Sequence, residues 1–297
     1  MDHVLDRLPS GSRVAVLRLR SLGDCVLTTP ALALLKRARP DLELAVVVED
    51  AFAALFGGNP AVDRILKPSA VELVRWRPRL TINLHGGTRS VQLTVAARSR
   101  FRAGFGHFRF QPIYNLRIPL AQQILGVDRT VHTAEHLASA MFYLGVPQTE
   151  VPRASLFAGR PEAGEYAVLH PFASDPAKTW SAQNFVSVAQ RLLASGLEPV
   201  FVGAHADDFS PFSGHRCLAG ASLQSIKNLL AGASLFVGND SGPAHMAAAF
   251  GKPVVVFFGP SDARVWGPWK TGNSIFRVDS AVPEVIAALP ALLALPR

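Results

Sequence analysis

The segment Val14-Ala-Val-Leu-Arg-Leu-Arg-Ser-Leu-Gly-Asp24-Cys-Val-Leu-Thr-Thr-Pro-Ala-Leu32 decides the fold class of this chain. It begins with a short, largely apolar run, Val14–Leu19, interrupted only by Arg18, which is typical of a buried strand. A turn that Gly23 makes possible then leads into a stretch with helical periodicity, Val26–Ala38. A strand that feeds a helix is the repeating unit of a parallel α/β sheet, and such sheets bind ligands in the loops at the carboxyl ends of their strands.

The same alternation continues along both halves of the chain. In the first half it predicts strands at Val14–Leu19, Leu44–Val48, Leu80–Leu84 and near Phe101–Gly104, and helices at Val26–Ala38, Ala51–Phe56, Val91–Ala97 and Ala134–Leu144. In the second half it predicts strands at Tyr166–His170, Pro199–Val202, Leu235–Gly238 and Val254–Phe258, and helices at Gln183–Ala194, Leu223–Ala231 and Pro243–Phe250. The fold class is therefore α/β, with crossover helices on both faces of parallel sheets.

Two domains are expected, because a chain of 297 residues more often divides than builds a single core. The stretch Val146–Gly164 is rich in proline and glycine and is the best candidate for a linker. We place an N-terminal Rossmann-like domain at residues 1–158 and a C-terminal one at residues 159–297. The last predicted helix, Val282–Leu295, is apolar enough to cross back onto the first domain, with a kink at Pro290.

The charge balance favours anionic partners, because 30 Lys and Arg residues against 22 Asp and Glu give a net charge of +8. The basic residues form no long run and no repeat with aromatic residues, so we do not expect a nucleic-acid-binding protein. Cys25 and Cys217 form no disulfide framework and no zinc spacing, which fits a reducing compartment. With no secretory signal and only strand-length apolar runs, we expect a cytoplasmic protein whose membrane contact, if any, is peripheral. We also expect a monomer.

Asp24 is the candidate catalytic base. A carboxylate in the loop after the first strand would face a cleft, where it could take a proton from an attacking sugar hydroxyl. Aspartate is also a good helix cap, so spacing alone leaves both roles open. Ser21 and Gly23 belong to the same loop, which lacks the glycine patterns of dinucleotide-binding and P-loop proteins.

A second strand, small-residue turn and helix occur in Val237–Gly251. The free N–H groups and positive dipole end of this helix would suit a diphosphate, and Gly242 allows its close approach. Asp240 could hold a sugar hydroxyl or position the loop, and His245 lies one turn into the helix, within reach of a phosphate. The alternative is an ordinary helix start, with Ser241 as its N-cap and His245 packed in the core.

The segment His170–Ser181 is a third loop between a strand and a helix, and it contains Ser174 and Lys178. Lys178 would be a point charge suited to a diphosphate leaving group, and no metal site is evident for that task. The alternative is a solvated loop lysine. We expect Trp180 to pack in the core.

Further polar residues follow predicted strands. His85 and Arg89 come after the strand Leu80–Leu84 and could meet an acceptor, although a glycine-rich turn with Arg89 in solvent is equally compatible. His132-Thr-Ala-Glu-His136 matches an inverted zinc-protease pattern, but no third ligand can be identified, so we expect no metal there. The residues that could lie near a nucleoside are His205, Asp207 and Asp208.

These segments, taken together and in this order, resemble glycosyltransferase family 9, the heptosyltransferases of lipopolysaccharide core assembly. The resemblance runs from about Arg13 to Trp269 and is most specific at Arg18–Leu32, Asp175–Trp180 and Gly238–Pro260. It implies a GT-B architecture, in which two Rossmann-like domains face each other across a cleft. The acceptor would lie mostly on the first domain and the nucleotide-sugar on the second, and transfer would invert the anomeric carbon without a metal.

Carried across by motif, the resemblance implies that Asp24 is the catalytic aspartate, that Lys178 binds phosphate and that Asp240–Gly242 form the donor-diphosphate loop. Ser241 stands where family members often carry Thr. His205-Ala-Asp-Asp208 occupies a place where they often carry a glutamate, which leaves nucleoside recognition open.

We therefore expect a glycosyltransferase that needs no cofactor. It would move a sugar, first of all heptose from ADP-heptose, onto an anionic glycolipid or glycan such as the lipopolysaccharide core, at the inner face of the cytoplasmic membrane. A GT-B epimerase or hydrolase of sugar nucleotides and a noncatalytic nucleotide-sugar-binding paralogue are the alternatives. Residue patterns do not determine the donor sugar, the nucleotide base, the acceptor linkage or the oligomeric state.

Overall fold

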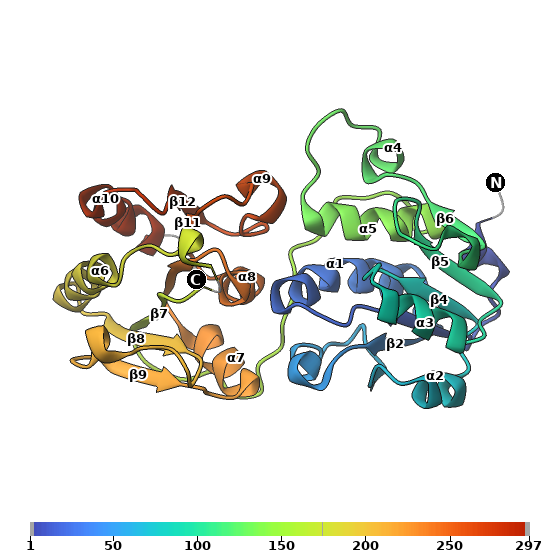
Figure 1. Ribbon diagram of the computed structural model, residues 1–297, viewed down its shortest axis with the longest axis horizontal. Coiled ribbons are helices and arrows are strands. Elements are labelled where there is room, and N and C mark those ends of the chain that lie inside the picture. Colours follow the sequence, from blue (N-terminus) through green and yellow to red (C-terminus); the bar gives the residue numbers. More distant parts are fainter. Residues whose placement is uncertain (1–2, 174, 295–297) are drawn as a thin grey trace. The chain divides into compact units, whose positions relative to one another are not determined.

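The structure is a computed structural model that describes residues 3–173 and 175–294 (Figure 1). The chain divides into two compact units, Met1–Ser155 and Leu156–Arg297. The boundary we placed after residue 158 lies slightly further along the segment 145–165, in which no helix or strand is assigned. Each unit contains one sheet, and the two are described separately.

The first unit is built on a six-stranded sheet with the order β3-β2-β1-β4-β5-β6, in which all neighbouring strands run parallel. This is the strand order of a doubly wound Rossmann fold. The strands are β1 (Arg13–Leu17), β2 (Glu43–Val47), β3 (Arg64–Leu66), β4 (Leu80–Asn83), β5 (Phe101–Phe105) and β6 (Leu116–Ile118).

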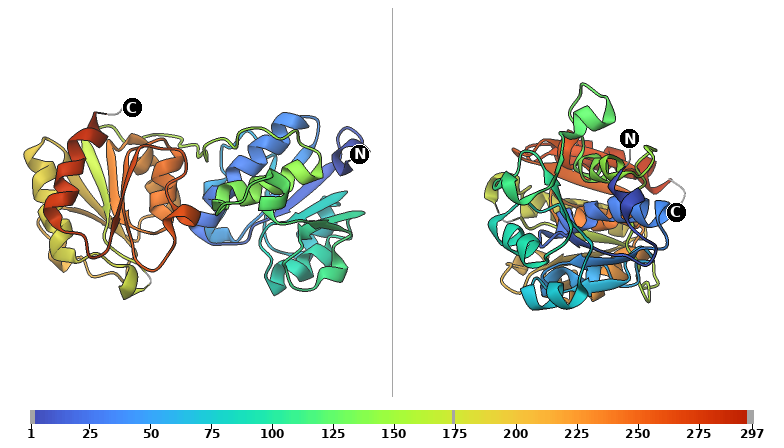
Figure 2. Two further views of the ribbon diagram at one scale, coloured as in Figure 1. Left: turned by 90° about the horizontal axis from the view of Figure 1, so that it is seen from above. Right: turned by 90° about the vertical axis from the view of Figure 1, so that its right-hand side faces the viewer.

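Helices cover both faces of this sheet, with α1 packed against α5 and α2 packed against α3 (Figure 2). The α-helices are α1 (Leu22–Ala38), α2 (Ala70–Trp76), α3 (Thr88–Ala96), α4 (Ala121–Leu125) and α5 (Thr133–Leu144), and the 3-10 helices are η1 (Val4–Arg7), η2 (Asp50–Leu55) and η3 (Gln111–Ile113). A parallel sheet between two helix layers confirms the predicted α/β class.

The second unit repeats the design with a parallel sheet of order β12-β11-β10-β7-β8-β9, which is the same order when its strands are counted from its own start. Its strands are β7 (Tyr166–His170), β8 (Glu198–Gly203), β9 (Arg216–Ala219), β10 (Leu235–Asn239), β11 (Val254–Phe258) and β12 (Asn273–Arg277). Its helices are η4 (Pro176–Lys178), α6 (Ala182–Ala194), η5 (Ser210–Phe212), α7 (Leu223–Gly232), α8 (Gly242–Ala249), α9 (Ala263–Trp266) and α10 (Val282–Leu293).

The core of the second unit includes Trp180 and the last helix. The Trp180 ring is buried and stacks on Phe257 at 4.0 Å between ring centroids, which confirms that this residue packs. Val285 and Leu289 of α10 lie in the same core, and α10 contacts α6 and β12. The apolar face that suggested a return to the first domain is thus buried within the second unit, and the helix continues through Pro290.

Several elements differ from the sequence-based expectation. Helix α1 begins at Leu22 instead of Val26, and the helix predicted at Ala51–Phe56 is the 3-10 helix η2. The edge strands β3, β6, β9 and β12 were not predicted, because they are short or carry alternating exposed positions that weaken the apolar signal. The serine caps were predicted correctly at Ser181 and Ser222, whose hydroxyls accept from helix amides.

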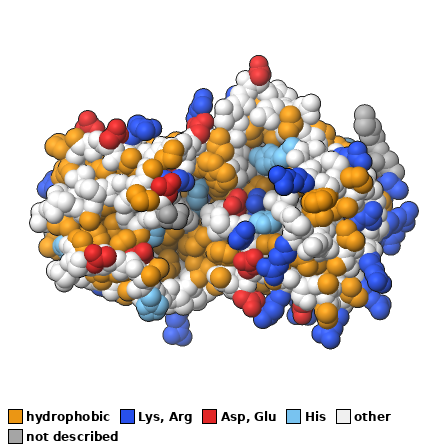
Figure 3. All heavy atoms as spheres, viewed as in Figure 1, with side chains coloured by type: hydrophobic (Ala, Val, Ile, Leu, Met, Phe, Trp, Pro, Cys, Tyr) orange, Lys and Arg blue, Asp and Glu red, His pale blue; other side chains and the backbone are white. Residues whose placement is uncertain are grey.

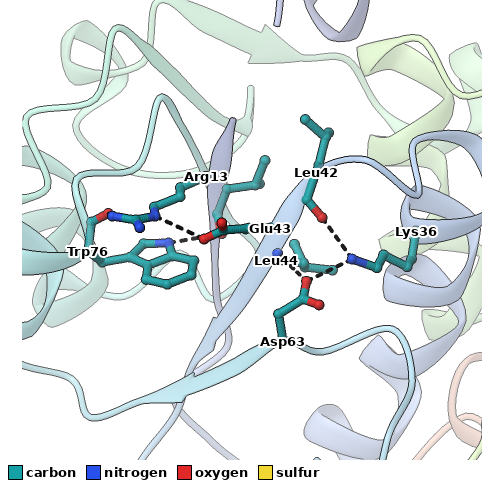
Figure 4. Close-up of polar contacts among 8 residues, drawn as sticks. Arg13, Lys36, Leu42, Glu43, Leu44, Asp63 and Trp76 are labelled. Carbon is teal, nitrogen blue, oxygen red and sulfur yellow. Dashed lines mark hydrogen bonds and ion pairs between the residues drawn. The ribbon is translucent and has the colours of Figure 1, made fainter. Parts of the chain in front are cut away.

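One ion pair joins the amino end of the first sheet to α1, and another joins β1 to β2 (Figure 4). Asp63 Oδ2 accepts from Lys36 Nζ at 2.8 Å and from the Leu44 amide at 2.7 Å. Burial alone would raise the pKa of Asp63, but these two donors prevail and lower it. Arg13 Nε donates to Glu43 Oε2 at 2.9 Å. The polar contacts at the amino ends of these strands therefore stabilise the fold, whereas parallel sheets bind ligands at the carboxyl ends of their strands.

Candidate active site

Both sheets have a switch point, where neighbouring strands connect to helices on opposite faces of the sheet. It lies between β1 and β4 in the first unit and between β7 and β10 in the second. Open α/β sheets bind ligands just outside the carboxyl ends of such strands. Most of the candidate residues lie in the loops that follow these four strands or in the first turn of the next helix.

In the first unit, Asp24 lies in the first turn of α1. Its Oδ2 accepts from the Ser21 hydroxyl at 3.0 Å and from the Ser21 amide at 3.4 Å. Asp24 therefore helps to cap α1 from its third position, with Ser21 as N-cap and Gly23 between them. Its side chain is still 23% exposed, so capping leaves the carboxylate accessible from solvent.

Arg18 is a further candidate residue, which the sequence analysis did not single out. Its side chain is buried, and its Nη1 lies 3.3 Å from Asp24 Oδ1. Burial lowers the pKa of Arg18, and the charge of Asp24 opposes that change. The signal available in the sequence was a lone arginine near the end of the first predicted strand, the end at which parallel α/β sheets bind ligands.

His85 belongs to the same group. Asn83 Oδ1 holds its loop by accepting from the amides of His85 and Gly86, at 3.0 and 3.1 Å. Burial and the charge of Arg18 lower the pKa of His85, while Asp24 acts in the opposite direction. The structure thus brings His85 together with Arg18 and Asp24, as expected for residues at one switch point.

Arg89 is placed differently. It lies in the first turn of α3 and forms an ion pair with Glu49, with 3.1 Å between Nη1 and Oε1. The exposed Arg89 side chain agrees with the alternative of a solvated arginine, and its role toward an acceptor stays a prediction.

The H-x-x-E-H segment is used for structure. His132 caps α5 by accepting from the Ala134 amide at 3.1 Å, and Glu135 pairs with Arg129 at 2.6 Å. His136 stacks on Phe105, with 4.1 Å between ring centroids. Within residues 3–173 and 175–294, no group of three or more His, Cys, Asp and Glu side chains is arranged to hold a metal ion.

In the second unit, Lys178 and Asp240 meet, with 3.5 Å between Nζ and Oδ2. Lys178 ends η4, a turn that Asp175 caps by accepting from the Ala177 amide at 2.9 Å. The turn packs on Gly259, where a Cβ atom would lie 2.2 Å from the Ala177 carbonyl oxygen. Two of the predicted donor loops are therefore in contact, while Ser174 lies outside the described residues.

Asn239 is a second residue that the sequence analysis did not single out. It is buried at the end of β10, where its Oδ1 accepts from the Trp180 amide at 3.0 Å. Its Nδ2 donates to the Pro171 carbonyl oxygen at 2.8 Å. One side chain thus fixes the loop after β7 to the loop after β10, which sets the position of Lys178 relative to Asp240.

Ser241 is the N-cap residue of α8, but its hydroxyl makes no capping bond to the helix amides. It is hydrogen-bonded to His170 Nδ1 at 3.1 Å and donates to the Asn239 carbonyl oxygen at 2.9 Å. Burial lowers the pKa of His170 to about 4, so the imidazole is neutral near pH 7. Ser241 is therefore the N-cap residue, as the alternative expected, but its side chain does not cap the helix, and Gly242 begins a helix whose N-terminus has no side-chain cap.

The remaining candidates of the second unit are His245 in α8 and three residues in the loop after β8. His245 is buried in α8, and its reach toward a phosphate stays a prediction. Asp207 and Asp208 accept from the amides of Ala204 and Ser210 at 2.6 and 2.9 Å, so both carboxylates shape the loop after β8. Contact with a nucleoside stays open for these residues and for His205.

Comparison with known proteins identifies the family. The model of glycosyltransferase family 9 (heptosyltransferase) matches residues 77–285, well over half of the chain. The chain belongs to glycosyltransferase family 9. It is 26% identical over 305 residues to lipopolysaccharide heptosyltransferase 1 of Escherichia coli (strain K12), across 89% of this chain and 93% of that protein.

Solved structures of the family show the same fold. The glycosyl transferase family 9 protein of Veillonella parvula DSM 2008 has a TM-score of 0.83 at 21% identity, covering 95% of this chain and 97% of its own. The E. coli ADP-heptose lps heptosyltransferase II has a TM-score of 0.79 at 19% identity, covering 95% and 98%. These findings confirm the predicted GT-B fold, and family membership makes the chain a glycosyltransferase.

The family match includes Lys178 and Asp240–Gly242, whereas Asp24 precedes the matched segment. The role of Asp24 is therefore argued from its surroundings in the first unit. None of the helices in the described part of the chain is long and apolar enough to cross a membrane.

Proposed function

We propose that this family 9 enzyme transfers heptose from ADP-heptose to a lipopolysaccharide-core or related glycan acceptor, with inversion and without a metal. The observation that carries the proposal is the Asp24 carboxylate, held at the switch point of the first sheet and still partly exposed. The names of the relatives, a lipopolysaccharide heptosyltransferase and an ADP-heptose lps heptosyltransferase, supply the donor and the class of acceptor.

In the proposed reaction, Asp24 accepts the proton of the acceptor hydroxyl while the hydroxyl oxygen attacks the anomeric carbon. A carbon–oxygen bond forms on the face opposite the diphosphate, and the bond from the anomeric carbon to the diphosphate oxygen breaks. ADP leaves with that electron pair, and the proton on Asp24 passes to solvent. A single displacement of this kind inverts the configuration at the anomeric carbon.

The second unit would hold the leaving group. Lys178 supplies positive charge for the diphosphate, a task that needs no metal when a lysine and backbone N–H groups are preorganised. The amides around Ser241 and Gly242 add donors at the start of α8, where the helix dipole also favours negative charge. Asp240 keeps Lys178 in place through their ion pair.

We also propose that the enzyme is cytoplasmic and monomeric. Lys and Arg side chains lie over both units on the face drawn in Figure 3, and the net charge of +8 would attract an anionic glycolipid acceptor. The same charge would favour peripheral contact with the anionic inner face of the cytoplasmic membrane.

The test is product analysis with the purified enzyme, ADP-heptose and a core glycolipid acceptor in the presence of a metal chelator. We expect ADP release that depends on the acceptor and, by NMR, a product linkage with inverted anomeric configuration. Modified or free sugar without acceptor would indicate an epimerase or hydrolase. Donor binding without turnover on any acceptor would indicate a noncatalytic paralogue.

A further inference from the structure

Arg18 carries a charge in an unusually enclosed place. It follows β1 between Leu17 and Leu19, and only 7% of its surface is exposed. Within residues 3–173 and 175–294, Asp24 is the acid that pairs with it, and the Arg18 Nε atom is buried without a hydrogen-bond partner. Burying a guanidinium is costly, and one ion pair at 3.3 Å compensates only part of that cost. Stabilisation of the fold is therefore a poor explanation for the buried Arg18–Asp24 ion pair.

The two oxygens of the Asp24 carboxylate are held by different groups. Arg18 Nη1 lies 3.3 Å from Oδ1, and the Ser21 hydroxyl and amide lie 3.0 and 3.4 Å from Oδ2. Rotation of the carboxylate would break both sets of contacts at once. The plane of the Asp24 carboxylate is therefore fixed by a single loop, because both Arg18 and Ser21 lie in the loop that precedes the first turn of α1.

We infer that Arg18 is a positioning residue for Asp24, fixing the plane in which its carboxylate receives the acceptor proton. This inference rests on the proposed role of Asp24 as the base. Proton transfer requires the base to lie at hydrogen-bond distance from the acceptor hydroxyl, and a displacement of about 1 Å can lower the rate on the order of 100-fold. Arg18 acts on the reaction through Asp24 and does not touch the reacting atoms.

The charge of Arg18 also affects the pKa values of two histidines, His85 and His136. Burial and Arg18 lower the pKa of His85, and burial, His107 and Arg18 lower the pKa of His136 to about 4. Removing the positive charge of Arg18 should raise both pKa values, because a nearby cation disfavours the imidazolium. Histidine titration by NMR therefore detects the loss of this charge independently of activity.

The experiment compares Arg18→Met and Arg18→Lys in the wild-type enzyme and in the Asp24→Asn background. In the wild type, we expect Arg18→Met to lower kcat about 10-fold to 100-fold while the KM values for donor and acceptor change little. Arg18→Lys restores the charge without the planar fork and should recover part of kcat. In the Asp24→Asn background, Arg18→Met should cause no further loss of residual turnover, because its effect passes through the missing carboxylate.

Arg37→Met is the matched control, since Arg37 is an exposed arginine in the last turn of α1 and should leave kcat unchanged. Should Arg18→Met fail to fold, Arg18→Lys and its Asp24→Asn double variant carry the same comparison. Two results would overturn the inference: a higher acceptor KM with unchanged kcat, or an equal loss of turnover in the Asp24→Asn background. Full turnover of the Asp24→Asn enzyme itself would instead refute the proposed base.

Discussion

Replacing Asp24 by Asn removes the proposed base with little change of shape. The new amide can keep its oxygen toward Arg18 and turn its NH₂ group toward Ser21, whose hydroxyl can reverse and accept. The Ser21 amide loses its acceptor, and the buried Arg18 loses a charged partner. Hydrogen bonds to charged groups contribute about 1.5–3 kcal/mol, so we expect a modest decrease in the free energy of unfolding and a folded protein.

Turnover should fall far more than stability. General base catalysis contributes about 10²–10⁴-fold, which corresponds to about 3–5 kcal/mol of barrier. The assay is ADP release at saturating donor and acceptor, with ADP affinity measured by calorimetry to show that the second unit still binds its ligand. Ser21→Ala is the control, because it removes one donor to Oδ2 but leaves the carboxylate, and it should cost less than about tenfold. Turnover of Asp24→Asn within about threefold of wild type, at unchanged ADP affinity, would refute the reasoning.

Further predictions concern the donor loops and the first sheet. Lys178→Met should weaken ADP binding about 10-fold to 100-fold in calorimetry, because a charge-assisted contact of about 1.5–3 kcal/mol is lost, and unchanged affinity would exclude a phosphate role. Gly259→Ala should destabilise the turn that carries Lys178 by about 1–3 kcal/mol and lower the melting temperature, since its Cβ would lie 2.2 Å from the Ala177 carbonyl oxygen. Asp63→Asn should lower the melting temperature at neutral pH. Because the folded pKa of Asp63 is depressed, its stabilisation is full above its ordinary value of 3.8 and is lost as the pH falls through the folded value. The difference from wild type should therefore narrow on acidification, and a difference independent of pH would argue against the ion pair.

Much of the fold was predictable because local patterns agree with it. The strands Tyr166–His170 and Val254–Phe258 were predicted with their observed bounds, since both are buried, largely apolar runs bounded by turns. The short edge strand β3 was missed, because three residues with two exposed positions give no such signal. The start of α1 was also misplaced, since a capping contact between Ser21 and Asp24 extends the helix into what reads as a loop.

For the candidate site, the sequence predicted which loops would contribute residues but not which side chains would contact one another. The loops containing Asp24, Lys178 and Asp240 were singled out because each follows a buried strand, and the family match includes the two loops of the second unit. Their roles in catalysis and donor binding stay predictions. The two residues that organise these loops, Arg18 and Asn239, were not identified. Arg18 was marked only by its place near a strand end, and nothing in the sequence indicated that it would pair with Asp24 or that Asn239 would bind the loop after β7.

By itself, the sequence determined the alternation of strands and helices, the helix caps at Ser181 and Ser222, and the type of residue at each strand end. These features depend on periodicity and on neighbours within a few positions. Only the tertiary structure decided that Asn239 bonds Trp180, 59 positions away, and that Ser241 turns from its helix toward His170. The reason is that strand order and crossover geometry choose which strand ends become neighbours, and both are set by the packing of the whole sheet.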